Sequence, residues 1–279
     1  MWCDAFRASP AEGWSRWDAA FRAANIAVPG TAAGAEGVLE SPAVQQLMAA
    51  ACDPQKLAAF SDAAGRVLSS RPPTLIHGDC RGDNLFRKDG TDDVRRIARP
   101  CSSAFRSLYS LALPSSVSQA ERDVSYPGMA LSGGQVFAFI DFQMMAAGTP
   151  GAELVQLLTG NFPNLDDFDR LEEVVADFHA KLVAAGPDCL ASDYSSEDLM
   201  EDFRISTILF FLGVVGQLHP TLEALCPVPG EAKHPLWALF GAWFPRMGRC
   251  LQQVKCAELF GEMVATVEEG VPPADASAK

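Results

Sequence analysis

The sequence predicts an α+β fold that is mostly helical, with a short β-hairpin that carries an Asp-rich loop. Apolar residues recur three and four positions apart in several long segments of the 279-residue chain, which is typical of helices with one buried face. Two short runs, 74–76 and 136–140, are instead apolar, β-branched or aromatic, as strands are. The Asp-rich loop follows the first run, and another Asp follows the second.

Residues 1–70 are expected to be helical. The Trp and Phe side chains of 11–24 lie three and four residues apart, on one face of a helix. Ser41 is placed to cap a second helix, and Asp53, followed by Pro, a third that runs to about residue 70. The glycines of 30–37 follow no strand and precede no Gly-Lys-Ser/Thr ending, so they predict a flexible connection rather than a phosphate-binding loop.

The strands are bounded by turn residues. Residues 74–76 follow an Arg-Pro-Pro turn and are expected to form a buried strand. Gly78 allows the chain to turn sharply after that strand. Residues 85–86 return to an apolar strand, and 136–140 forms a second one that delivers Asp141 at its end.

Two polar segments follow these strands. Residues 76–85 read Ile-His-Gly-Asp-Cys-Arg-Gly-Asp-Asn-Leu, with Asp79 and Asn84 five positions apart, and Asp141 begins Asp-Phe-Gln. Carboxylate and amide oxygens are the hard ligands that Mg²⁺ prefers. An isolated Asp-rich loop is usually only a solvated turn. The second Asp, at the end of an apolar strand, favours a binding site over that alternative.

The two segments, in this order, resemble the aminoglycoside phosphotransferase and choline-kinase-like family of small-molecule kinases, in its CHK-kinase-like or APH-domain branch. The resemblance implies a protein-kinase-like large (C-terminal) lobe, Mg²⁺ and ATP as cofactors, and a small-molecule hydroxyl as the acceptor. In this family a later acidic residue, usually Asp, opens a helix that packs beneath the site, and this chain has Glu there. The implied roles are Asp79 as catalytic base or hydroxyl-orienting residue, His77 as a brace of the catalytic loop, Asn84 and Asp141 as metal ligands, and Arg81, Asp83, Gln143 and Glu153 as substrate or loop support.

The resemblance also implies a small nucleotide-binding lobe before the loop, with a strand lysine, its glutamate partner and a loop over the phosphates. Residues 1–76 contain one lysine, Lys56, inside the helix expected after Asp53. We therefore expect the large lobe alone, with the small lobe missing. Two functions stay open: a phosphotransferase, either truncated or completed by a lobe from elsewhere, and a non-catalytic pseudokinase or binding fragment.

A long segment separates the two halves of the hairpin. In the family a short hairpin joins the loop Asn to the metal Asp, and such connections are usually about 2–5 residues long. Here residues 87–135 intervene, and 95–134 is rich in Ser without a sustained apolar period. We expect 94–135 to be a disordered insertion or a retained non-coding segment of the gene.

The C-terminal half predicts a helical bundle. The apolar run 205–218, opened by 195–198, is too short to cross a bilayer and is expected to be the central buried helix. Residues 171–185 and 235–260 are the expected flanking helices. Four aromatic residues follow helical spacing and should pack in the core, although the resemblance also implies that late helices wall the acceptor pocket: Trp237, Phe240, Trp243 and Phe244. Three histidines lack ligand spacing and are expected to be structural or exposed: His179, His219 and His234.

The expected organisation follows from these segments. It comprises a helical segment of the C-terminal lobe at 1–70, catalytic and metal-binding loops at 71–93 and 136–160, the insertion at 94–135, the helical lobe at 161–265 and a disordered tail at 266–279.

Composition narrows the choice of partners. A net charge of -13 argues against nucleic acids and anionic membranes, and is compatible with a cationic small substrate. The eight cysteines include no C-x-x-C pair, so neither a zinc site nor a disulfide framework is indicated. Reduced thiols fit a cytoplasmic protein, and no charged-then-apolar leader follows Met1.

Overall fold

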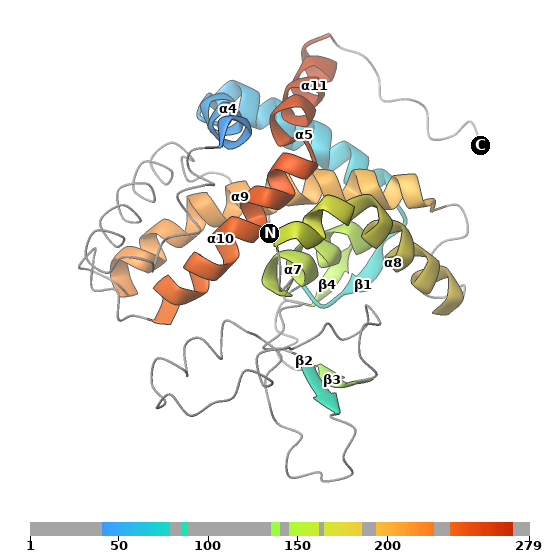
Figure 1. Cartoon of the computed structure of the whole chain (residues 1–279). Helices are drawn as coiled ribbons and strands as arrows, with labels where there is room; N and C mark the ends of the chain where they lie inside the picture. The colour runs from blue at the N-terminus through green and yellow to red at the C-terminus, as the bar shows by residue number, and fades with distance from the viewer. Residues whose placement is uncertain are drawn as a thin grey trace.

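A computed structural model of the chain describes residues 41–78, 85–88, 135–139, 145–161, 165–185, 194–225 and 235–269. For 85–88, 135–139, 161, 165–167, 216–225 and 235–242 it describes the backbone alone. Helices predominate and two pairs of antiparallel strands accompany them, so the predicted α+β class is confirmed (Figure 1). The helix expected at 11–24 and the connection at 30–37 lie outside the described residues.

The elements follow one another in the order α4 (Pro42–Ala51), α5 (Pro54–Ser70), β1 (Thr74–Ile76), β2 (Leu85–Lys88), β3 (Gln135–Phe139), β4 (Ala146–Gly148), α7 (Pro150–Asn161), the 3-10 helix η5 (Leu165–Arg170), α8 (Leu171–Ala185), α9 (Ser196–Leu225), α10 (Pro235–Gln253) and α11 (Cys256–Glu268). The helix predicted at 171–185 is confirmed at both ends by α8. The range expected to be inserted, 94–135, lies outside the described residues except that β3 begins at its last position.

Three helix starts show how the sequence sets local structure. Asp53 caps α5, because its Oδ1 accepts hydrogen bonds from the N–H groups of Gln55 at 2.9 Å and Lys56 at 3.4 Å. Ser195 and Asp198 cap α9 reciprocally, each side chain accepting the backbone N–H of the other residue. The predicted side-chain cap at Ser41 is wrong: its Oγ instead lies 3.0 Å from Gln252 Nε2, which joins α4 to α10.

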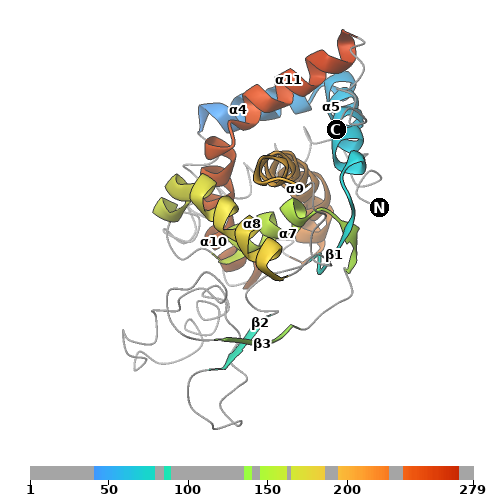
Figure 2. The same cartoon turned by 90° about the vertical axis from the view of Figure 1, so that its right-hand side faces the viewer.

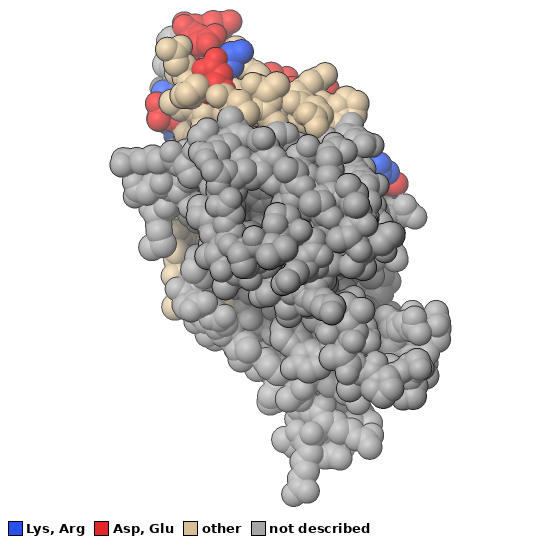
Figure 3. Space-filling view, turned by 90° about the vertical axis from the view of Figure 1, so that its left-hand side faces the viewer, with Lys and Arg blue, Asp and Glu red and all other residues tan. Residues whose placement is uncertain are grey.

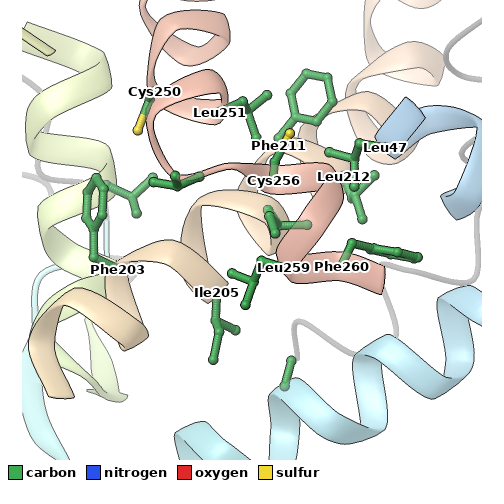
Figure 4. Close-up of a cluster of buried hydrophobic side chains, with 14 of the residues drawn as sticks. Leu47, Phe203, Ile205, Phe211, Leu212, Cys250, Leu251, Cys256, Leu259 and Phe260 are labelled. Atoms are coloured by element: carbon green, nitrogen blue, oxygen red, sulfur yellow. The ribbon is translucent and has the colours of Figure 1, made fainter. Parts of the chain in front are cut away.

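Helix α9 runs through the middle of the helical bundle in both cartoon views (Figures 1 and 2). Most of its apolar side chains between Leu199 and Val215 are buried, and the others are half-buried, which confirms the predicted central helix up to Val215, the last residue of α9 whose side chain is described. Phe260 of α11 stacks on Phe60 of α5, with ring centroids 4.6 Å apart. Figure 4 shows how α4, α9, α10 and α11 contribute to one apolar cluster, which includes Leu47, Phe211, Leu251 and Phe260.

The single helix predicted for 235–260 is wrong, because the chain turns between α10 and α11. Lys255 adopts a left-handed conformation with φ of 52°, which an α-helix cannot continue through. The turn lets α10 pack on α7 and α9 while α11 packs on α4 and α5, so Leu251 and Phe260 are both buried. Helix α11 then continues to Glu268, three residues into the range expected to be a disordered tail.

Of the predicted aromatic core, Phe244 is confirmed as fully buried and Trp243 packs edge-on against it. The side chains of Trp237 and Phe240 lie outside the described set. Trp243 also donates from Nε1 to Thr159 Oγ1 at 3.3 Å, which ties α10 to α7.

The surface carries charges of both signs. On the face in Figure 3, acidic and basic side chains lie close together at the upper end, beside uncharged residues. Within the described ranges, no helix combines the length and apolar character needed to cross a bilayer.

Helices α7 and α9 approach each other closely at Gly151. A Cβ at this position would lie 2.6 Å from the backbone N of Phe203 and 2.7 Å from both the carbonyl carbon and the Cβ of Asp202. The start of α7 therefore rests directly on the backbone of α9, and buried Leu154, Val155 and Leu158 continue this helix pair.

We expect Gly151→Ala to destabilise the protein by about 1–3 kcal/mol, because the new methyl group overpacks against backbone that cannot rotate away. Gly261→Ala in α11 is the matched control. No atom lies within 4 Å of a Cβ there, and Ala favours a helix over Gly by up to about 1 kcal/mol. Denaturant unfolding of both variants measures the difference, and equal stability of the two would contradict the close approach.

Candidate functional site

The two strand pairs frame the segments that carry the predicted site. β1 pairs with β4 in antiparallel fashion, with Thr74 opposite Gly148 and Ile76 opposite Ala146. β2 pairs with β3, with Leu85 opposite Phe139. The predicted strands at 74–76 and 85–86 are confirmed, and so is the strand predicted at 136–140 as far as residue 139; residue 140 lies outside the described residues.

The predicted burial of the first strand is wrong at its centre, where Leu75 is 72% exposed. Among the described strands β1 pairs with β4 alone, and it packs on α7. Successive side chains of a strand point to opposite faces. Ile76 points to the covered face, where its side chain contacts Gly148, and Leu75 points to the open one.

The connections between the strand pairs are the two segments singled out from the sequence. Residues 77–84 join β1 to β2, and residues 140–145 join β3 to β4. Both segments therefore run between the same two strand pairs. In sequence, Asn84 immediately precedes Leu85, and Asp141 stands two residues after Phe139, which pairs with Leu85. Six of the predicted site residues lie outside the described residues: Asp79, Arg81, Asp83, Asn84, Asp141 and Gln143.

The described start of the loop is held by α7. Gly78 has φ of 77°, a conformation that favours glycine. Its N–H donates to Glu153 Oε2 at 3.0 Å, and its carbonyl oxygen accepts from Gln156 Nε2 at 2.7 Å. His77, the preceding residue, is half-buried. Among the predicted site residues, the structure thus brings Glu153 to the loop that begins at His77.

Sequence reasoning missed Gln156. Its position three residues after Glu153 places both side chains on one helix face, which is the signal that could have found it.

A buried carboxylate lies beside the entry to this loop. Asp202 is fully buried, and its Oδ1 accepts from Arg71 Nε at 3.3 Å while its Oδ2 accepts from the Tyr194 hydroxyl at 2.7 Å. Arg71 also forms ion pairs with Asp198 and Glu201. Arg71 stands three residues before β1, so this cluster ties the start of the strand to the first turns of α9.

Burial shifts the pKa of two groups in this cluster, Asp202 and Tyr194. Burial raises the pKa of the Asp202 carboxyl to about 6, although the hydrogen bond from Tyr194 and the charge of Arg71 pull it down. The pKa of Tyr194 is raised as well, first by burial and then by its hydrogen bond to Asp202. Sequence reasoning missed this cluster too, although the spacing of its three acidic residues on α9 is that of one helix face.

Among the residues that the structure describes, the titratable groups outside this cluster form no second centre. A ring nitrogen of His179 lies 2.8 Å from the carbonyl oxygen of Tyr194, in the structural role expected of it, while the side chains of His219 and His234 lie outside the described set. The described cysteines are free thiols, and burial raises the pKa of Cys250 and Cys256 to about 12. No group of three or more metal-ligating side chains occurs among the residues that the structure describes.

Comparison of the chain with protein-family models, with curated proteins and with solved structures finds no match. A functional assignment therefore rests on the residues of this chain and on their geometry.

The raised pKa of Asp202 predicts a pH-dependent difference in stability. The pKa of an ordinary Asp side chain is about 3.9. Between about pH 4 and 6 the folded state therefore holds a proton that the unfolded state has lost. The contribution of Asp202 to the free energy of unfolding must then fall as pH rises through this range. Asn at this position does not titrate.

We therefore measure the free energy of unfolding by denaturant between pH 4 and 7. As pH rises, the value for Asp202→Asn should increase relative to that of the wild type by up to roughly 2–3 kcal/mol. Asp62→Asn, on the exposed face of α5, is the control and should run parallel to the wild type. A parallel profile for Asp202→Asn would contradict the shift.

Proposed function

We propose that the chain is an ATP- and Mg²⁺-dependent phosphotransferase of the aminoglycoside phosphotransferase and CHK-kinase-like type, acting on a hydroxyl group of a small molecule. One observation carries the proposal. The segment with Asp79 and Asn84 and the segment with Asp141 connect the same two antiparallel strand pairs. A kinase-type site needs these segments side by side, although they are far apart in sequence.

The residue types fit the proposed chemistry. Asn84 and Asp141 offer an amide and a carboxylate oxygen to Mg²⁺, and water and phosphate oxygens would complete its coordination. Asp79 would orient the acceptor hydroxyl and take its proton, with His77 bracing the loop. ATP would supply the phosphoryl group. Because such transfer is catalysed mainly by positioning and by charge stabilisation, these few groups suffice only where the backbone holds them in place.

The described part of the lobe supports this assignment. An acidic residue in the first turn of α7, Glu153, contacts the backbone of the loop at Gly78. The resemblance implies an acidic residue in a helix beneath the site at this point of the chain. The longer side chain of Glu still reaches the Gly78 N–H, at 3.0 Å.

The proposed function predicts that Asp79→Asn abolishes phosphoryl transfer and leaves the melting temperature unchanged. Loss of a group that acts in the transition state typically costs about 10²-fold or more in rate. The assay follows the labelled γ-phosphate of ATP onto a panel of small alcohols that includes choline and an aminoglycoside. Asp62→Asn is the control, and an active Asp79→Asn enzyme would overturn the assignment.

A second candidate is a non-catalytic pseudokinase or binding fragment. The observation that favours it concerns the lysine that a kinase uses to hold the ATP phosphates. Lys56 is the single lysine of residues 1–76, and it lies exposed in the first turn of α5 rather than on a strand.

Calorimetry of the purified chain with Mg-ATP tests how tightly the chain binds nucleotide. We expect weak binding and low turnover, because the single lysine of residues 1–76 lies in helix α5 and no Gly-Lys-Ser/Thr sequence occurs in this range. Micromolar affinity would contradict this expectation. Phosphoryl transfer that Asp79→Asn abolishes would eliminate the second candidate.

A further inference from the structure

The contact between Gln156 and Gly78 has no assigned role in the proposed function. Gln156 is 7% exposed, and its Nε2 lies 2.7 Å from the carbonyl oxygen of Gly78. A buried amide donor that loses its acceptor costs about 1–3 kcal/mol, so this hydrogen bond is not readily exchanged for water.

The acceptor atom matters because of where it lies in the backbone. The carbonyl of Gly78 belongs to the planar peptide group that joins Gly78 to Asp79, whereas its N–H belongs to the group that joins His77 to Gly78. Gln156 holds the first group and Glu153 holds the second, at 2.7 and 3.0 Å. Together they fix the peptide planes on both sides of a glycine, the residue whose backbone is otherwise least restricted.

We call these two hydrogen bonds, which join Glu153 and Gln156 to Gly78, the Gly78 clamp. The helix that carries both side chains is held rigidly. Glu153 and Gln156 lie in the first two turns of α7, whose start has no room for a Cβ between Gly151 and the backbone of α9. Gln156 also donates without a charge. An ionised carboxylate in place of Gln156 could not donate to the Gly78 carbonyl. A lysine there could form an ion pair with Glu153 and so draw the Glu153 carboxylate away from the Gly78 N–H.

We propose that Gln156 is a positioning residue: by donating to the carbonyl of Gly78 it sets the orientation of the Gly78–Asp79 peptide group, and with it the direction in which the chain presents Asp79. The consequence for catalysis rests on the proposed function, whereas the orientation of the peptide group does not.

The sequence allows this orientation to be measured directly. It contains two Gly-Asp bonds, Gly78–Asp79 and Gly82–Asp83. In the full chain labelled with carbonyl-¹³C Gly and ¹⁵N Asp, an NMR experiment that correlates each carbonyl with the following amide therefore shows two signals. The Gly82–Asp83 signal serves as the internal reference.

Three variants test the proposal, with circular dichroism as the check of folding. Gln156→Leu removes the donor and should shift the Gly78 carbonyl signal upfield. Gln156→Glu keeps the shape; it should show the same shift at neutral pH and return toward the wild-type position in acid, where a protonated carboxyl donates again. Gln252→Leu removes a comparable amide donor, the one to Ser41, and should leave both signals in place.

The pH-dependent rescue distinguishes positioning from a general loss of stability, which would not recover in acid. A Gly78 carbonyl signal that stays in place in folded Gln156→Leu or Gln156→Glu would overturn the proposal. In the transfer assay, Gln156→Leu should lower kcat by roughly 10–100-fold with little change in KM. Absence of transfer by the wild type would refute the proposed function and leave the NMR result intact; wild-type transfer with unchanged kcat in Gln156→Leu would refute the catalytic part of this inference.

Discussion

Asp202, buried in α9, contacts both Arg71, which precedes β1, and the start of α7. One of its oxygens accepts from Arg71, just before β1, and the other accepts from Tyr194. The backbone of Asp202 also supports Gly151 at the start of α7. Since β1 delivers Gly78 and α7 clamps it, the entry to the loop depends on one residue of α9. A buried ion pair is weak evidence for stability. We therefore interpret the Arg71–Asp202 pair as fixing the position of β1 relative to α9.

From this base the structure builds outward by backbone contacts. The β1–β4 ribbon places Ile76 opposite Ala146, and the β2–β3 pair places Leu85 opposite Phe139. Neither pair alone would define a site. Each of the two polar segments leaves one pair and enters the other, and the proposed function rests on this arrangement. Phosphoryl transfer would depend on it, because positioning is most of what a protein contributes to that reaction.

Local signals predicted the elements well. Asp53 before a proline and the apolar period of 171–185 gave the start of α5 and both ends of α8, since caps and periodicity are encoded within a few residues. The break at Lys255 left no such signal, because a left-handed lysine is held by the packing of α11 on α4 and α5. The exposure of Leu75 also left no local signal, because it depends on which elements of the fold cover the two faces of β1.

The candidate site could be predicted only where its residues lie close together in the sequence or follow a recognisable strand. The spacing of Asp79, Asn84 and Asp141 is visible in the sequence. The strand pairing adds that the segments carrying them connect the same two strand pairs. The contact between Arg71 and Asp202 joins residues 131 positions apart, and no periodicity reports such a contact. Gln156 was missed for a different reason: it shares a helix face with Glu153, but neither polar side chain identifies its partner until the fold supplies one.

The proposed function requires that the segments 77–84 and 140–145 meet at one divalent metal. Mn²⁺ tests it directly, because this ion shares the oxygen ligands of Mg²⁺ and broadens the NMR signals of nearby nuclei. In the full chain with labelled Gly carbonyls and Asp amides, Mn²⁺ should broaden the Gly78–Asp79 and Gly82–Asp83 signals, and Asp141→Asn should restore both. Signals that Mn²⁺ leaves sharp in the wild type, or broadens equally in Asp141→Asn, would contradict the account.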